Sequence, residues 1–117
     1  MTAVKWPGEW LRGVLQLCVL SALEAGPTYG YAIGQRLEEA GLGTVKGGTL
    51  YPLLGRLESD GLVRSTWAAG EGGPGRKYFQ LSDAGRRELH DRVLMWRQFT
   101  AATALLLPAA GTTEEES

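Results

Sequence analysis

The side chains best suited to catalysis are few in this chain and lie far apart in the sequence. His90 is the single histidine and Cys18 the single cysteine. His90 stands among arginine and aspartate residues, as in a solvated helix face, whereas Cys18 falls in an apolar stretch typical of a protein core. No nucleophile–base pair and no metal-ligating set at metal-site spacing occurs. The sequence therefore predicts no enzyme, no metal site and no cofactor.

Basic side chains between residues 44 and 80 indicate a different chemistry, the binding of an anionic polymer. The chain has a net charge of −1, but three carboxylates lie together in the C-terminal stretch GTTEEES, and the rest is net positive. Basic residues outnumber acidic ones between residues 44 and 80, and they are Lys46, Arg56, Arg64, Arg76 and Lys77. This weak bias is compatible with nucleic-acid binding but does not establish it.

The elements that position these residues follow from hydrophobic periodicity, which predicts the order helix, helix, helix, strand, strand, long helix. The expected helices cover residues 10–24, 29–40, 50–60 and 83–107, and the expected strands cover 62–67 and 76–82. The first helix should be buried almost all round, while Thr28 and Ser82 are expected to cap the second and the last. The stretch AAGEGGPG should form a flexible loop between the strands.

Pro52 lies inside the third helix, where a proline normally breaks the hydrogen-bond pattern. If Thr49 is the N-cap, Pro52 falls in the first turn, where an amide has no acceptor within the helix and its loss costs nothing. Gly41 and Gly61 are placed to end the second and third helices. The apolar residues of the third helix then share one core face, and they are Leu50, Leu53, Leu54 and Leu57.

This order of elements is that of a winged helix-turn-helix, an α+β fold in which a β-hairpin, the wing, stands beside a recognition helix. We expect residues 1–81 to form a winged-helix DNA-binding domain and residues 82–108 a long C-terminal dimerisation helix. Residues 109–117 contain the three glutamates and little apolar side-chain surface, so a disordered acidic tail is expected there.

Four motifs in this order carry a resemblance to a known family. LRGVLQLCVLSAL, GPTYGYAIGQRL, GTLYPLLGRLESDGLV and GGPGRKYFQLSDAGRREL follow one another over roughly residues 10 to 100. Together they resemble the PadR family of bacterial transcriptional regulators, in the compact branch with a single C-terminal helix. The resemblance implies a homodimeric repressor that binds double-stranded DNA and is released from it by small molecules. It also implies that Tyr51 and Pro52 are signature positions of the recognition helix.

The residues expected to contact DNA come from the third helix and the wing. A recognition helix enters the major groove by its N-terminal end, which also favours a phosphate. Tyr51 offers a phenol to a phosphate or a base edge, and packing against the second helix is the alternative. Wing cations suit phosphate or minor-groove contact, or else protect a solvated hairpin edge. The set is Lys46, Gly48, Thr49, Tyr51, Pro52 and Arg56 from the helix, with Arg64, Arg76 and Lys77 from the wing.

The last helix carries a wider apolar stripe than one small domain needs. A second subunit would cover it and would place two recognition helices about 34 Å apart on a palindromic site. Such a seam also suits a flat apolar or aromatic effector, and a dry dimer core without ligand is the alternative. The residues expected there are Trp10, Leu89, Val93, Met95, Trp96 and Phe99.

Targeting signals are absent from the sequence, which has no signal peptide and no apolar stretch long enough to span a bilayer. We therefore expect a cytoplasmic protein without a membrane partner. The rival interpretation of the fold is a winged-helix adaptor that binds proteins and not DNA. Basic residues gathered on one face would disfavour the adaptor, whereas an uncharged apolar groove there would favour it.

Overall fold

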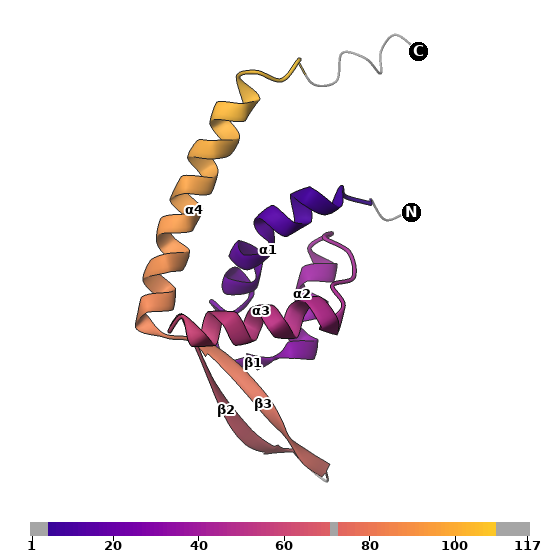
Figure 1. The fold of residues 1–117 in the computed structure, drawn as a ribbon, viewed down its shortest axis with the longest axis vertical. Coiled ribbons are helices and arrows are strands. Elements are labelled where there is room, and N and C mark those ends of the chain that lie inside the picture. Colours follow the sequence, from indigo (N-terminus) through magenta and orange to yellow (C-terminus); the bar gives the residue numbers. More distant parts are fainter. Residues whose placement is uncertain (1–4, 71–72, 110–117) are drawn as a thin grey trace.

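The computed structural model describes residues 5–70 and 73–109. The elements are α1 (Gly8–Ala22), β1 (Thr28–Tyr29), α2 (Gly30–Glu39), α3 (Gly47–Ser59), β2 (Val63–Gly70), β3 (Gly73–Leu81) and α4 (Asp83–Ala104). The strands form an antiparallel sheet in the order β1-β3-β2 (Figure 1). The architecture is the expected α+β winged helix with a long C-terminal helix, to which the structure adds the short strand β1.

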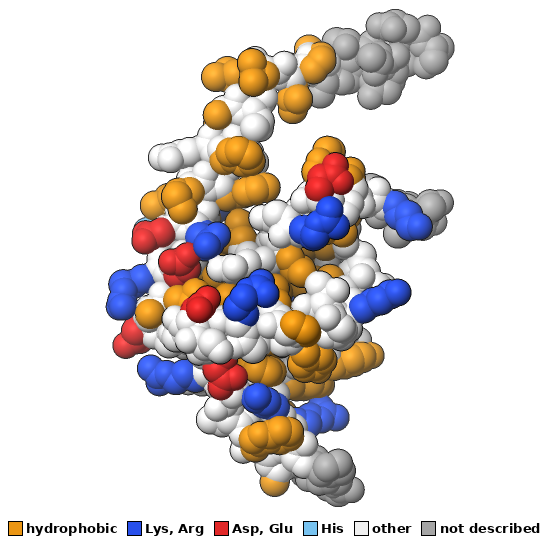
Figure 2. Space-filling view, in the orientation of Figure 1, with side chains coloured by type: hydrophobic (Ala, Val, Ile, Leu, Met, Phe, Trp, Pro, Cys, Tyr) orange, Lys and Arg blue, Asp and Glu red, His pale blue; other side chains and the backbone are white. Residues whose placement is uncertain are grey.

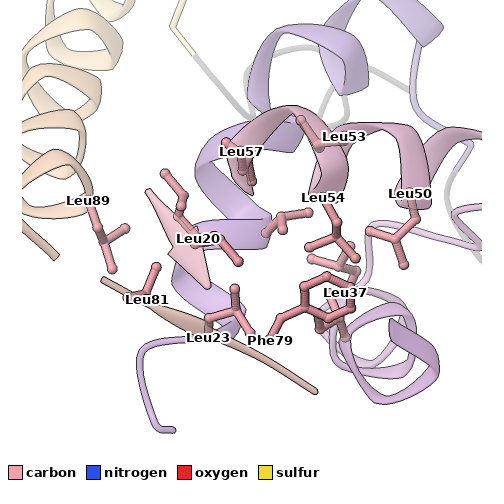
Figure 3. Packing of buried hydrophobic residues seen from close by; sticks show 13 residues of the cluster. Leu20, Leu23, Leu37, Leu50, Leu53, Leu54, Leu57, Phe79, Leu81 and Leu89 are labelled. Carbon is pink, nitrogen blue, oxygen red and sulfur yellow. The ribbon is translucent and has the colours of Figure 1, made fainter. Parts of the chain in front are cut away.

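The hydrophobic core lies where α1, α2 and α3 meet the sheet. The four leucines expected on one face of α3 are all buried. They pack against residues from every neighbouring element (Figure 3), chiefly Leu20 and Leu23 from the end of α1, Leu37 from α2, and Phe79 and Leu81 from β3. Because a fully buried leucine contributes about 1.5–3 kcal/mol to stability, this face fixes α3 on the body with its other face outward.

The prediction that helix α1 is buried almost all round is wrong. Val19 and Leu20 are fully buried, whereas Leu11 and Val14 in the first half of the helix keep part of their surface exposed. Core contacts are therefore concentrated in the C-terminal half of α1. The remaining apolar surface of its first half is open in a single subunit.

The starts of α2 and α3 differ from the prediction. Thr28 does not cap α2 but is buried in β1 opposite Phe79, and α2 begins after Tyr29 with no side-chain cap. Helix α3 begins before Thr49, because the Lys46 carbonyl already accepts the Thr49 and Leu50 amides, each at 2.9 Å. Pro52 therefore lies in the second turn of α3.

The proline in the second turn of α3 removes the amide that would otherwise bond the Gly48 carbonyl. Gly48 is exposed, so solvent or a ligand can reach this part of the backbone.

Both predicted glycine C-caps are confirmed. Gly41 has φ 99° and Gly61 has φ 78°, a left-handed conformation that favours glycine. The amide of Leu42 donates to the Leu37 carbonyl at 3.1 Å, and the corresponding bond at the end of α3 measures 3.0 Å. These 6→1 bonds, together with the amides of both glycines, satisfy the last carbonyls of the two helices.

The wing is longer than the sequence predicted. Strands β2 and β3 pair from Val63 opposite Leu81 to Gly70 opposite Gly73, so most of the expected loop AAGEGGPG belongs to the strands. The pairing shifts between Ala68 and Gly70. A Cβ at Gly75 would lie 2.8 Å from the Ala68 carbonyl oxygen, so this close approach of the two strands requires glycine.

The N-terminus of α4 is joined directly to the end of α3. Ser82 is its N-cap, as predicted, and the Ser82 Oγ accepts the Gly85 amide at 3.0 Å. The same hydroxyl donates to the Gly61 carbonyl at 2.6 Å, and the Ser82 amide donates to the Leu62 carbonyl at 3.0 Å. Gly85 is buried against that Leu62 carbonyl. One joint thus connects α3, the base of the wing and α4.

From this joint α4 projects away from the body (Figure 1). The radius of gyration is 17.1 Å, whereas a compact domain of this length has about 13 Å. The helix ends at Ala104, three residues before the predicted end, and Leu105, Leu106 and Leu107 follow it with most of their surface exposed. In the described part of the chain, no helix is both long and apolar enough to cross a membrane.

Candidate nucleic-acid interface

The outward face of α3 carries most of the residues predicted to contact DNA. The N-cap residue Lys46 is exposed, and so are all the predicted residues on α3 itself. These are Gly48, Thr49, Tyr51, Pro52 and Arg56. A Cβ at Gly48 would meet no atom within 4 Å, so nothing inside the subunit requires glycine at this position. The first turn therefore presents bare backbone and the positive end of the helix dipole.

Tyr51 combines the two roles that the sequence left open. Its ring lies over the start of α2, where a Cβ at Gly30 would overlap the Tyr51 hydroxyl group and lie 2.5 Å from the ring carbon Cζ. Glycine at position 30 is therefore required for the Tyr51 ring to pack here. Half of the Tyr51 surface, 51%, nevertheless remains exposed. The phenol is thus held by packing and is still accessible to a ligand.

An open cleft of about 470 Å³ lies between the wing on one side and the start of α2 with Tyr51 of α3 on the other. Its lining is aromatic, cationic and glycine-rich, and consists of Tyr29, Gly30, Tyr31, Tyr51, Trp67, Gly75, Arg76 and Lys77. Basic and hydrophobic side chains lie next to each other on the wing (Figure 2). Phenol and cationic donors suit phosphate oxygens, while the aromatic faces suit apolar contacts to sugars or bases.

The two wing cations that line the cleft, Arg76 and Lys77, are each held by a neighbour. The Arg76 guanidinium lies over the Tyr29 ring, 4.5 Å from its centroid, and Tyr29 in turn packs edge-on against Tyr78. The Lys77 Nζ lies 3.8 Å from Glu58 Oε1. Arg76 therefore keeps its full charge at the cleft, whereas the charge of Lys77 is partly offset.

Glu58 connects α3 to the wing. Besides its ion pair with Lys77, Glu58 accepts a hydrogen bond from Ser65 Oγ on β2 at 2.5 Å. This carboxylate therefore fixes the wing against the C-terminal half of α3 and leaves the cleft open at the N-terminal half.

Not all predicted DNA contacts come together. Arg64 pairs with Gln80 at the base of the wing and borders a different hollow, beside Glu58 and Asp83. Three aromatic residues of the cleft, Tyr29, Tyr31 and Trp67, were absent from the predicted set. Strand alternation places Trp67 on the face of Val63 and Ser65, which is typical of a core position, and only the length of the wing exposes it.

A second open region lies between α1 and the outer half of α4. A hollow of about 260 Å³ is lined by Gly13, Leu17, Arg92, Met95, Trp96 and Phe99. The Trp96 and Phe99 rings are 5.9 Å apart, and Trp10 is 61% exposed. Leu89, in contrast, is only 6% exposed, and Val93 packs against the same core. These two residues hold α4 on the body of their own subunit.

The residues considered for catalysis remain apart. His90 is exposed on α4, whereas Cys18 is half-buried against the core, and burial raises the pKa of its thiol. Within residues 5–70 and 73–109, no three histidine, cysteine, aspartate or glutamate side chains gather to hold a metal ion.

Comparison with known sequences gives a family and a partial relative. The model of the "Transcriptional regulator PadR-like family" matches residues 19–91. An uncharacterised 37.1 kDa protein in transposon TN4556 of Streptomyces fradiae is 39% identical over 92 residues. This match covers 74% of the present chain and 26% of that protein, so the chain spans about a quarter of this relative's length.

Solved structures are similar over most of the chain. A PadR family transcriptional regulator from Eggerthella lenta is 40% identical with a TM-score of 0.78, over 86% of this chain and 88% of that one. Bacillus subtilis PadR in complex with operator DNA is 30% identical with a TM-score of 0.62, over 68% and 45%. With the family model matching most of the winged helix, this chain belongs to the PadR-like family of transcriptional regulators.

Proposed function

We propose that this chain is a homodimeric repressor that binds a palindromic operator in double-stranded DNA and is released by a small apolar or aromatic effector. The observation that carries the proposal is the cleft beside the exposed first turn of α3, where tyrosine hydroxyls and wing cations converge. The B. subtilis structure, described as a complex with operator DNA, supports the same use of the fold.

In the proposed complex, α3 enters the major groove and the wing follows the adjacent backbone into the minor groove. Arg76 and Lys77 line the same cleft as Tyr51, whereas an adaptor would favour an uncharged apolar groove there. The composition of the cleft therefore favours DNA over a protein partner.

The proposed dimer joins through α4 and the first half of α1, both of which leave apolar side chains exposed in one subunit. Residues 1–81 would serve as the DNA-binding domain and 82–108 as the dimerisation helix; the expected acidic tail falls, from residue 110, outside the described residues. Trp10, Met95, Trp96 and Phe99 are all exposed in one subunit. Met95, Trp96 and Phe99 border the hollow between α1 and α4, and their aromatic and thioether surfaces suit a flat apolar effector.

The proposed function is tested by selecting duplexes from a random DNA pool and measuring their affinity at two salt concentrations. Enrichment of a palindrome, with an affinity that falls steeply as salt rises, is the expected result. The selected duplex then serves to screen apolar aromatic compounds for release of the protein. Absence of any enriched sequence together with salt-independent behaviour would contradict the proposal and favour the adaptor.

The two wing cations should contribute unequally to the salt dependence of DNA binding. Arg76→Gln is expected to reduce the slope of log affinity against log salt by about 1, as for one lost phosphate contact. Lys77→Gln should reduce it less, because Glu58 already pairs with this ammonium group. Titrations of the selected duplex at several salt concentrations measure both slopes, with Arg87→Gln on the distant α4 as control. An unchanged slope for Arg76→Gln would remove this residue from the interface.

Gly48→Ala should weaken DNA binding without weakening the fold. The added methyl group meets nothing within the subunit, and alanine favours a helix over glycine by about 1 kcal/mol. If the backbone of the first turn lies against DNA, this methyl group should lower affinity about tenfold.

The matched control for Gly48→Ala is Gly55→Ala, two turns further along the same face, where a Cβ also meets no atom within 4 Å. Because the helix enters by its N-terminal end, this change should have little effect on affinity. Equal affinities of the two variants and the wild type in a fluorescence-anisotropy titration would contradict the proposed approach.

A further inference from the structure

We propose that Trp67 is the apolar DNA contact of the wing and packs against the deoxyribose edge of the minor groove next to the site read by α3. This inference rests on the proposed function and adds a residue, and a salt-independent mode of contact, to it. Within the described part of the wing, Trp67 is the large apolar side chain that is left open, with 72% of its surface exposed.

The exposure of Trp67 does not follow from its place in the strand. It shares a sheet face with Val63 and Ser65, and Val63 is buried in the core. The wing extends beyond the body (Figure 1), and Trp67 is not part of the hydrophobic core but lines the cleft. The ring therefore faces the cleft and not the interior.

The backbone of the wing supports the ring on one side. A Cβ at Gly75 would lie 3.8 Å from Trp67 Cε3, so the indole lies beside a residue that has no side chain. Glycine is required there in any case by the Ala68 carbonyl. The ring thus has one supported side, and its opposite surface is available to a ligand.

The charges around Trp67 indicate what that ligand is. Lys77 lies directly opposite Trp67 in the hairpin, and Arg76 borders the same cleft. An apolar ring with a cation on its flank matches a DNA strand, in which each apolar sugar stands between two phosphates. A purely apolar protein surface would offer neither cation an anionic group, whereas DNA offers phosphates, so the composition favours DNA.

The position of the cleft determines which part of the DNA Trp67 would contact. With α3 in the major groove, a hairpin on its flank crosses one strand and reaches the adjacent minor groove, which is about 6 Å wide. The sugars of that strand form the wall of the groove. Apolar side chains are established partners of minor grooves, and aromatic stacking on a nucleotide makes a sizeable contribution.

The experiment compares the full-length wild type with Trp67→Thr and Trp67→Phe on the palindrome recovered by selection. Threonine retains strand propensity and phenylalanine retains a ring. Each protein is titrated with two duplexes, one carrying six additional base pairs on each side and one trimmed to the palindrome. Trp67→Thr should bind the long duplex about tenfold more weakly, and Trp67→Phe should recover most of this loss. The loss should disappear on the trimmed duplex, and the salt slope should be unchanged.

Each other outcome has a defined meaning. Wild-type affinity of Trp67→Thr for the long duplex overturns the inference while the proposed function stands, and so does an equal loss on both duplexes. A change of oligomeric state in Trp67→Thr, measured by light scattering, would instead assign the ring to a protein contact. A wild-type chain that binds no duplex overturns both proposals.

Discussion

Phe99→Glu is expected to leave a monomer that binds the operator at least about 100-fold more weakly than the wild type. Phe99 is exposed, borders the hollow between α1 and α4, and lies 5.9 Å from the Trp96 ring. In the proposed dimer this surface is buried, so an unpaired carboxylate there would cost several kcal/mol in each subunit. Loss of the second half-site contact then removes the gain from bivalent binding, which is typically 10²–10⁴.

Light scattering coupled to size exclusion measures the mass of the Phe99 variant, and titration with the selected duplex measures its affinity. The matched control is Ala101→Glu, which adds the same charge about 160° away around the helix. Ala101 is exposed and does not line the hollow that Phe99 borders. A Phe99→Glu protein that remains dimeric would contradict the proposed seam, whereas monomers of both variants would indicate that the whole of α4 is covered.

Gly85→Ala should be the most destabilising single-methyl change at any glycine in the described part of the chain. A Cβ at this position would overlap the Leu62 carbonyl oxygen and lie 3.0 Å from its carbon. Both are backbone atoms, held in place by the Ser82 amide and by the end of α3, so neither can rotate away. Overpacking of this kind costs about 3 kcal/mol, and relief requires α4 to tilt from its seat.

Urea unfolding at one fixed protein concentration measures the effect of Gly85→Ala, since stability depends on concentration if the chain is a dimer. Gly55→Ala is the control, because it makes the same chemical change in a helix with open space around it and should stabilise by up to about 1 kcal/mol. A Gly85→Ala protein as stable as the wild type would show that the joint between α3 and α4 can yield.

The parts of the fold that sequence reasoning predicted are those set by local pattern. The leucine face of α3, the two glycine C-caps and the Ser82 N-cap each depend on residues within one or two turns. The parts that it missed depend on distant partners. Thr28 adopts a strand and not a cap because β3 offers it Phe79, far along the chain, and no local signal specifies that pairing.

The candidate site was predictable to a similar extent. The type and position of Arg76 and Lys77 indicated a DNA contact, but their engagement with Tyr29 and Glu58 depends on tertiary structure. Trp67 was missed because strand periodicity assigns it to the buried face. Its exposure depends on how far the hairpin continues through a glycine-rich stretch, which composition alone suggested was a loop.

The joint at Ser82 makes α4 a lever arm with its fulcrum at the end of the recognition helix (Figure 1). The helix has 22 residues and is therefore about 33 Å long. Over that length, a displacement of about 3 Å at the far end corresponds to a rotation of about 5° at the fulcrum. In the proposed dimer, a small change in how the two subunits meet would thus reach α3 as a change of angle. The distance between the two α3 helices would change without any rearrangement inside either winged helix.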